Sequence, residues 1–201
     1  MPREGLIKKA WTGRFLLAAW ALIAVIGLAY LSREHLASLP EPGNEALLGR
    51  ALLRLRRGSN ASFLVHVVYG ECSCSRSLFA HLLARGRFSG AEELILYVGT
   101  GSNKQQAAER SGFEFSAISD SELVSRYGLE AAPVLVVFDA NGKLRYAGGY
   151  YDHPATITPL DERIHAHLAT GASVQALPVF GCAVSPRLRK SLDPLRALSS
   201  R

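Results

Sequence analysis

Between residues 63 and 169 the chain alternates short apolar runs with segments of helical pattern. Four runs rich in β-branched, leucine and aromatic residues are expected to form strands: 63–69 (FLVHVVY), 94–98, 113–118 and 134–138. The segments between them have the apolar spacing or the capping residues of helices, and they lie at 75–85, 104–111 and 119–127. This alternation predicts an α/β fold in which helices cover a largely parallel sheet.

Turn and capping residues extend this prediction at both ends of the domain. Residues 139–142 (DANG) predict a tight turn, followed by an antiparallel strand at 143–147. A last helix is expected from Thr158, as its N-cap, to about Ala169. Before the first strand, Asn44 is expected to cap an amphipathic helix that ends near Arg57.

The stretch YGECSCSRSLFAHLL (69–83) places two cysteines at the start of a predicted helix. The chain has only three cysteines, Cys72, Cys74 and Cys182, so it is not a disulfide-rich scaffold. A thiol at a helix N-terminus meets unpaired backbone amides, which stabilise the thiolate and lower its pKa. These residues therefore favour thiol–disulfide chemistry, in which Cys72 pairs with Cys74 or one of the two pairs with Cys182.

A metal site is the alternative for the same residues. Two thiolates at Cys72 and Cys74, joined by Cys182 or by His153, would suit a soft ion such as Cu(I). The leading interpretation includes no cofactor and no metal. A third possibility is that the cysteines are small residues in a turn, and that the domain is a non-catalytic assembly module.

Two stretches resemble the thioredoxin superfamily. One is the strand, loop and cysteines of 63–83, and the other is SRYGLEAAPVLVVFDANGKLRYAGGY at 125–150. The likeness covers roughly 59–171. The segment PVFGCA at 178–183 lies outside the usual fold and is similar to a set of membrane-anchored thioredoxin-like proteins called RedB-like.

The resemblance implies a thioredoxin-like fold, a central mixed sheet flanked by helices. It also implies that Pro133 is a cis-proline facing the cysteines, beside an edge that receives an extended substrate. Cys72 takes the place of the family's first cysteine, and Ser75 stands where the second is usual. The predicted roles are Cys72 as nucleophile, Cys74 or Cys182 as resolving thiol, and Pro133 as the residue that shapes substrate docking.

Residues 15–31 (FLLAAWALIAVIGLAYL) contain no charge and are preceded by Arg3, Lys8, Lys9 and Arg14. Seventeen apolar residues lie at the low end of the length of a spanning helix. The positive-inside rule then places the N-terminus in the cytoplasm. We expect a single-pass inner-membrane protein with a periplasmic main domain, and a cleaved signal peptide is the alternative.

The predicted organisation follows from these segments. It consists of a cytoplasmic N-terminus (1–14), a transmembrane anchor (15–31), a linker and amphipathic helix (32–58), the thioredoxin-like domain (59–171), and an extension with Cys182 and a basic tail (172–201). The net charge of +6 arises from clusters without a nucleic-acid motif, so nucleic acid is not an expected partner. The expected partners are protein thiols and disulfides or a membrane redox protein. We therefore predict a membrane-tethered thiol–disulfide oxidoreductase, with a copper-binding protein on the same fold as the alternative.

Overall fold

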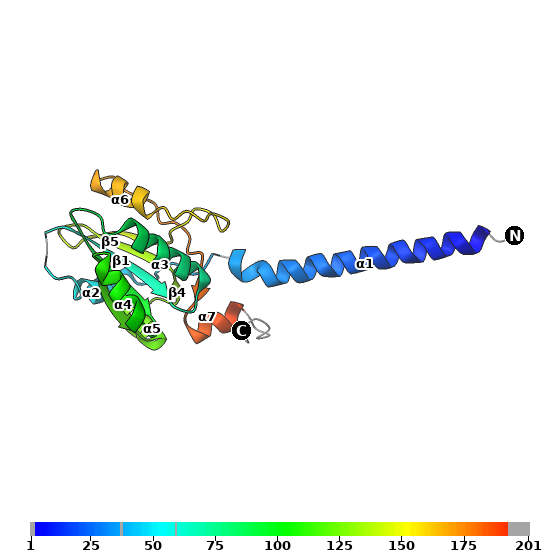
Figure 1. Ribbon diagram of the computed structural model, residues 1–201, viewed down its shortest axis with the longest axis horizontal. Coiled ribbons are helices and arrows are strands. Elements are labelled where there is room, and N and C mark those ends of the chain that lie inside the picture. Colours follow the sequence, from blue (N-terminus) through cyan, green and yellow to red (C-terminus); the bar gives the residue numbers. More distant parts are fainter. Residues whose placement is uncertain (1–2, 37, 59, 193–201) are drawn as a thin grey trace.

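Five strands form a mixed sheet at the centre of the domain (Figure 1). The computed structural model describes residues 3–36, 38–58 and 60–192. The strand order is β3-β2-β1-β5-β6, where β1 runs parallel to β2 and antiparallel to β5. β2 and β3 are parallel, and β5 and β6 are antiparallel. The bounds are β1 Ser62–Tyr69, β2 Ala91–Val98, β3 Glu114–Ile118, β5 Val134–Phe138 and β6 Leu144–Gly148.

Helices cover both faces of this sheet. On one face lie α2 (Glu45–Leu53) and α5 (Asp120–Tyr127), and on the other lie α3 (Ser73–Arg85), α4 (Ser102–Arg110) and α6 (Asp161–Ala169). Residues of β1 alternate between the two cores, because successive side chains of a strand point to opposite faces. The strand order, the strand directions and the two helical layers agree with the predicted thioredoxin-like fold.

A short second sheet lies beside the first. It pairs β4 (Ala131–Ala132) with β7 (Cys182–Ala183) in antiparallel register. α7 (Pro186–Leu192) follows β7 and packs against it. These three elements were not predicted from the sequence. The basic tail at 193–201 lies outside the described residues.

Two of the predicted helix N-caps, Asn44 and Ser119, are confirmed. The Asn44 side chain accepts a hydrogen bond from the Leu47 amide, and Ser119 accepts one from the Glu122 amide. The cap predicted at Thr158 is wrong, because α6 begins at Asp161 with Leu160 as its N-cap. The Leu160 amide donates instead to the Tyr150 carbonyl, 2.8 Å away, which ties the residues before α6 to the end of the hairpin.

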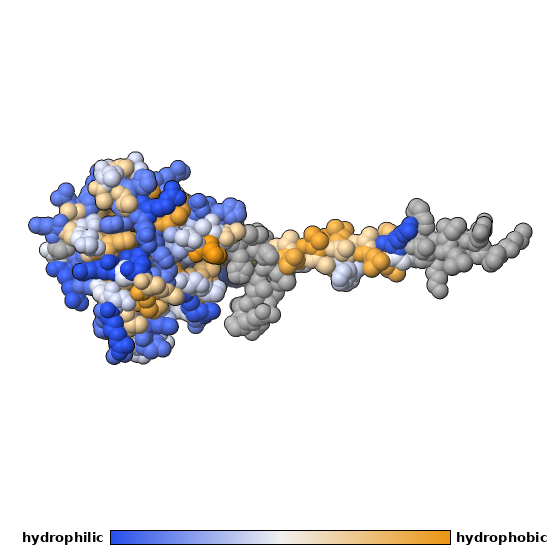
Figure 2. Space-filling view, turned by 45° about the horizontal axis from the view of Figure 1, so that its top comes forward, coloured by the Kyte–Doolittle hydropathy of each residue, from blue (hydrophilic) through white to orange (hydrophobic). Residues whose placement is uncertain are grey.

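α1 (Arg3–Leu36) extends away from the domain (Figure 1). It continues five residues beyond the apolar run, into the segment predicted as a linker. Its apolar side chains are exposed from Phe15 to Leu28, and Figure 2 shows the hydrophobic surface that they form. Within the described residues, no helix combines the length and the apolar content needed to cross a membrane. The transmembrane anchor predicted at 15–31 is therefore not supported.

A network of charged side chains is buried between the sheet and the helices α3 and α6. Glu93 and Asp161 are fully buried carboxylates. The Arg85 guanidinium donates to Glu93 at 2.7 Å and to Asp161 at 2.8 Å. His66, in the middle of β1, lies 2.8 Å from Glu93 and 2.8 Å from the Tyr150 hydroxyl. The charges are therefore removed from water but paired, as buried charges must be.

The pKa of Glu93 reflects this pairing. Burial by itself raises the pKa of Glu93, but the hydrogen bonds and electrostatic attraction of His66 and Arg85 outweigh it. The resulting pKa is about 2, against an ordinary value of 4.5. Glu93 therefore stays ionised inside the protein at neutral pH.

Candidate redox site

Cys72 is the N-cap residue of α3, directly after the central strand. Its amide donates to the Tyr69 carbonyl at 3.0 Å, and its carbonyl accepts from the Arg76 amide at 3.0 Å. These bonds hold the residue at the turn between β1 and the helix. Its side chain makes no capping hydrogen bond, so the first-turn amides of α3 have no side-chain oxygen from residue 72 as an acceptor.

Cys72 forms a disulfide with Cys182. The two residues are 110 positions apart in sequence, and their Cα atoms are 5.8 Å apart. This is one of the pairings that the sequence left open, and the structure does not form the alternative one between Cys72 and Cys74. Closing a loop of this length stabilises a folded chain by roughly 5 kcal/mol in the chain-entropy treatment.

Cys74 is the free thiol of the site and is partly buried. Burial raises the pKa of the Tyr151 hydroxyl to about 12, and the electrostatic effect of Cys74 raises this pKa further. Cys74 is therefore close enough to influence a neighbouring side chain electrostatically.

Pro133 lies at the other side of the disulfide. The Ala132–Pro133 bond is cis, as the resemblance implies. Ala132 is the register partner of Cys182 in the β4–β7 pair. The chain's own segment thus occupies the strand edge beside Pro133, where the resemblance places an extended substrate.

Two glycines allow the C-terminal segment to approach so closely. A Cβ atom on Gly181 would overlap the Ala132 carbonyl and lie 2.5 Å from Pro133 Cδ. A Cβ atom on Gly149 would overlap the carbonyl group of Pro178. Side chains larger than hydrogen cannot fit at either position without moving backbone. The close backbone contacts of Gly149 and Gly181 were not predicted from the sequence, although the glycine next to Cys182 was the signal that could have indicated them.

The segment is anchored on both sides of Cys182. Val179 and Val184 are fully buried. The Leu39 amide donates to the Val179 carbonyl at 2.8 Å, and the Val184 amide donates to the Glu130 carbonyl at 2.7 Å. Residues 180–183 between the anchors are partly exposed. Arg189 adds a further restraint, because its side chain bonds to the carbonyls of Ala183 and Val184 and to Asp120.

Ser75 stands in the third position of α3, three residues after Cys72. Its side chain is buried, and its hydroxyl has no hydrogen-bond partner among the described residues. A buried hydroxyl without a partner is costly, so such a group calls for an explanation. An N-cap side chain and the third residue of a helix lie within reach of each other. The unpartnered hydroxyl therefore lies in the first turn of the helix that begins after Cys72.

The residues of the metal alternative do not form a cluster. In the part of the chain that the structure describes, no group of three or more histidine, cysteine, aspartate or glutamate side chains could hold a metal ion. His153 is exposed, and its Nδ1 accepts a hydrogen bond from the Ala155 amide. Cys72 and Cys182 are bonded to each other rather than available as thiolates. The copper alternative therefore gains no support from the geometry.

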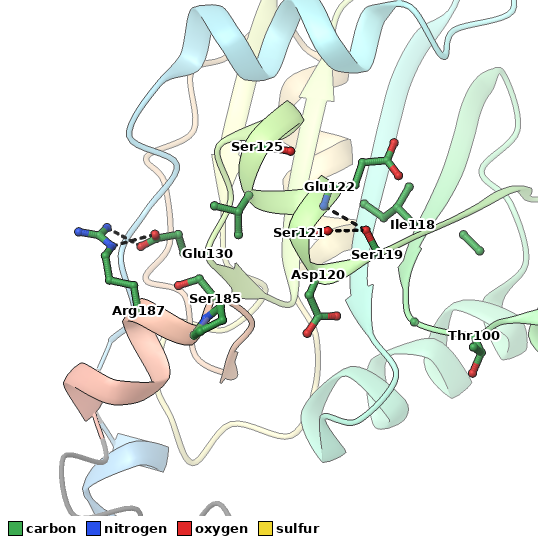
Figure 3. A pocket seen from close by; sticks show the side chains of 14 residues that line it. Thr100, Ile118, Ser119, Asp120, Ser121, Glu122, Ser125, Glu130, Ser185 and Arg187 are labelled. Carbon is green, nitrogen blue, oxygen red and sulfur yellow. Dashed lines mark hydrogen bonds and ion pairs between the residues drawn. The ribbon is translucent and has the colours of Figure 1, made fainter.

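A shallow hollow of about 1040 Å³ lies where β2 and β3 end and α5 begins (Figure 3). Its lining includes Asp120, Glu122 and Glu130, and α7 contributes Arg187. Arg187 forms an ion pair with Glu130 at 2.7 Å. The cysteines do not contribute to the lining given by the described residues. The hollow therefore adjoins the C-terminal segment without being part of the disulfide site.

Comparison with solved structures finds proteins that are similar to this chain but share little of its sequence. An uncharacterized conserved protein from Geobacillus kaustophilus is 20% identical, over 64% of this chain and 80% of its own, with a TM-score of 0.48. A hypothetical protein from Sinorhizobium meliloti 1021 is 18% identical, over 74% and 89%, with a TM-score of 0.47. A thiol-disulfide isomerase from Corynebacterium glutamicum is 14% identical, over 70% and 95%, with a TM-score of 0.39.

No protein-family model matches the sequence, and no curated protein matches it. The narrower likeness to RedB-like proteins therefore stays a prediction.

Proposed function

We propose that the chain is a thiol–disulfide oxidoreductase whose redox couple is Cys72 and Cys182. The observation that carries the proposal is the disulfide itself, which joins a helix N-cap to a segment held beside Pro133. The helix amides favour the thiolate of Cys72, and a stabilised thiolate is what makes a disulfide easy to reduce. Pro133 would shape the surface beside the couple, and protein thiols or disulfides would be the partners.

The proposal is tested by titrating the protein against a thiol redox buffer under metal-free conditions, with each cysteine mapped after alkylation. We expect a reversible transition between about −120 and −270 mV, the range of catalytic disulfides. Cys74→Ser should keep the transition, and Cys72→Ser should abolish it. These two variants are matched, since each removes one thiol from the same turn.

A different result would identify another role for the bond. Reduction only below about −300 mV is typical of a structural disulfide and would overturn the catalytic role. Cysteines that stay unpaired across the whole titration would overturn the couple itself. The non-catalytic assembly module would then become the leading interpretation.

We further propose that α1 holds the domain at the periplasmic side of the inner membrane. The exposed apolar side chains of α1 support attachment to a membrane, and the disulfide supports the periplasmic side, where disulfides form and persist. A lysine in the apolar run would disfavour contact with lipid by about 3 kcal/mol. Ile23→Lys should therefore move the full chain from the membrane fraction to the soluble fraction, whereas Gly13→Lys, at the basic end, should not. A wild-type chain found in the soluble fraction would refute the location.

A further inference from the structure

The two sulfur-bearing residues of the disulfide differ in their access to solvent. Cys72 is 1% exposed, whereas Cys182 lies in the partly exposed stretch between Val179 and Val184. A thiolate breaks a disulfide by attacking one of its sulfur atoms, so the accessible sulfur controls the reaction. Because Cys72 is buried, an attacking thiolate reaches the disulfide at Cys182.

The strand edge beside Pro133 gives no other entry. β7 already pairs with β4, and Ala132 faces Cys182 in that pair. An extended partner that added a strand to β4 would have to remove β7 first. That step would expose Val179 and Val184, both fully buried, and would break the bond from the Val184 amide to Glu130. A partner thiol must therefore reach the disulfide while the C-terminal segment remains in place.

Resting on the proposed function, we infer that Cys182 is the sulfur that partner thiols attack and that Cys72 is the leaving thiolate. The thiol with the lower pKa leaves faster from a disulfide. Cys72 is suited to leave because it is the N-cap residue of α3, where unpaired first-turn amides stabilise a thiolate, and the buried hydroxyl of Ser75 in the same turn has no other partner among the described residues. This order of roles is the reverse of the one that the sequence predicts, with Cys72 as nucleophile.

The step balances as an ordinary thiol–disulfide exchange. The partner thiolate forms a bond to Sγ of Cys182, the Cys72–Cys182 bond breaks, and its electron pair leaves on Sγ of Cys72. A second thiol of the same partner then attacks the partner's sulfur in the mixed disulfide and releases Cys182. The partner dithiol is oxidised by two electrons to a disulfide, and the protein disulfide is reduced to two thiols. The partner is therefore a dithiol that needs no strand pairing with β4.

The experiment uses the full oxidised chain with Cys74→Ser, so that one disulfide and no other thiol is present. Reduced glutathione is added in excess, the reaction is stopped with acid after short intervals, and free thiols are alkylated. We expect glutathione on Cys182 and the alkyl label on Cys72, with at least about a tenfold preference over the reverse pattern. A preference for glutathione on Cys72, or equal labelling, would overturn the inference.

A second measurement covers the case in which the mixed disulfide is too short-lived to collect. Cys72→Ser and Cys182→Ser, each combined with Cys74→Ser, leave a single thiol to react with oxidised glutathione. Because Cys72 is only 1% exposed, the thiol of Cys182 should react at least about ten times faster than that of Cys72 in the folded proteins. The two rates should become equal in denaturant, which shows that the fold causes the difference. Equal rates in the folded proteins would refute the inference.

This result is independent of the test of the proposed function. A disulfide that is reduced only at a structural potential overturns the oxidoreductase. The position of the glutathione adduct overturns only the order of attack. The two failures therefore lead to different observations on the same protein.

Discussion

Replacing Arg85 by methionine is expected to lower the free energy of unfolding by about 3–5 kcal/mol at neutral pH. The side chain of Arg85 is only 7% exposed, and it bridges the buried carboxylates of Glu93 and Asp161. Methionine keeps most of the apolar contact but leaves two buried negative charges without their shared cation. Chemical denaturation measures the loss, and Arg76→Met, on the exposed side of the same helix, is the matched control.

The effect of Arg85→Met should depend on pH. The pKa of Glu93 is about 2 in the folded wild-type protein, below its ordinary value of 4.5. The stability from its pairing is therefore fully present above pH 4.5 and is lost as the pH falls toward 2. The variant lacks much of this contribution. The difference in free energy of unfolding between the wild type and Arg85→Met should therefore be largest near neutral pH and should become smaller in acid. A difference in free energy of unfolding that stays constant between pH 2 and pH 7 would contradict the role of the Glu93–Arg85 pair.

The second large effect is expected for Gly181→Ala. The added methyl group would overlap the Ala132 carbonyl and press on Pro133, so β7 can no longer pair with β4 at its present distance. Overpacking costs about 1–3 kcal/mol, and the loss of the disulfide that depends on this pairing adds to it. We expect Cys72 and Cys182 to remain largely as free thiols after air oxidation.

Thiol counting and thermal unfolding check this expectation. A reductant should lower the melting temperature of the wild-type protein but have little further effect on Gly181→Ala. Gly43→Ala is the matched control, because a Cβ atom there meets nothing within 4 Å. If Gly181→Ala forms the disulfide as fully as the wild type and is equally stable, the glycine has no role in seating β7.

The sequence predicts the sheet well because its strands are apolar runs bounded by glycine and capping residues. The first residues of β2 could not be predicted in this way. The strand was predicted from Leu94, yet it begins at Ala91, and Glu93 is fully buried within it. A glutamate in a strand pattern is expected to be exposed to solvent unless side chains that pair with it are known. Those partners, His66 and Arg85, come from a different strand and a helix.

The candidate site shows the same limit. The cysteine at the helix start and the cis-proline were accessible from local sequence and from the resemblance. The choice between Cys74 and Cys182 was not, because local spacing says nothing about contacts made across 110 residues. Strand β7 holds two residues and has no periodicity of its own. Its place is set by Gly149, Gly181 and the buried valines on either side, which are tertiary contacts.

The long interval between Cys72 and Cys182 also has a consequence for biosynthesis. At roughly 5–20 residues per second, a ribosome adds the second cysteine about 5–20 seconds after the first. The strands and helices that lie between them are all made in that interval, while Cys72 and Cys74 have no other thiol in the chain. The native bond can close only after Cys182, in the last strand of the described residues, has been synthesised and lies beside Pro133. The disulfide can therefore form only after every strand of the central sheet has been synthesised.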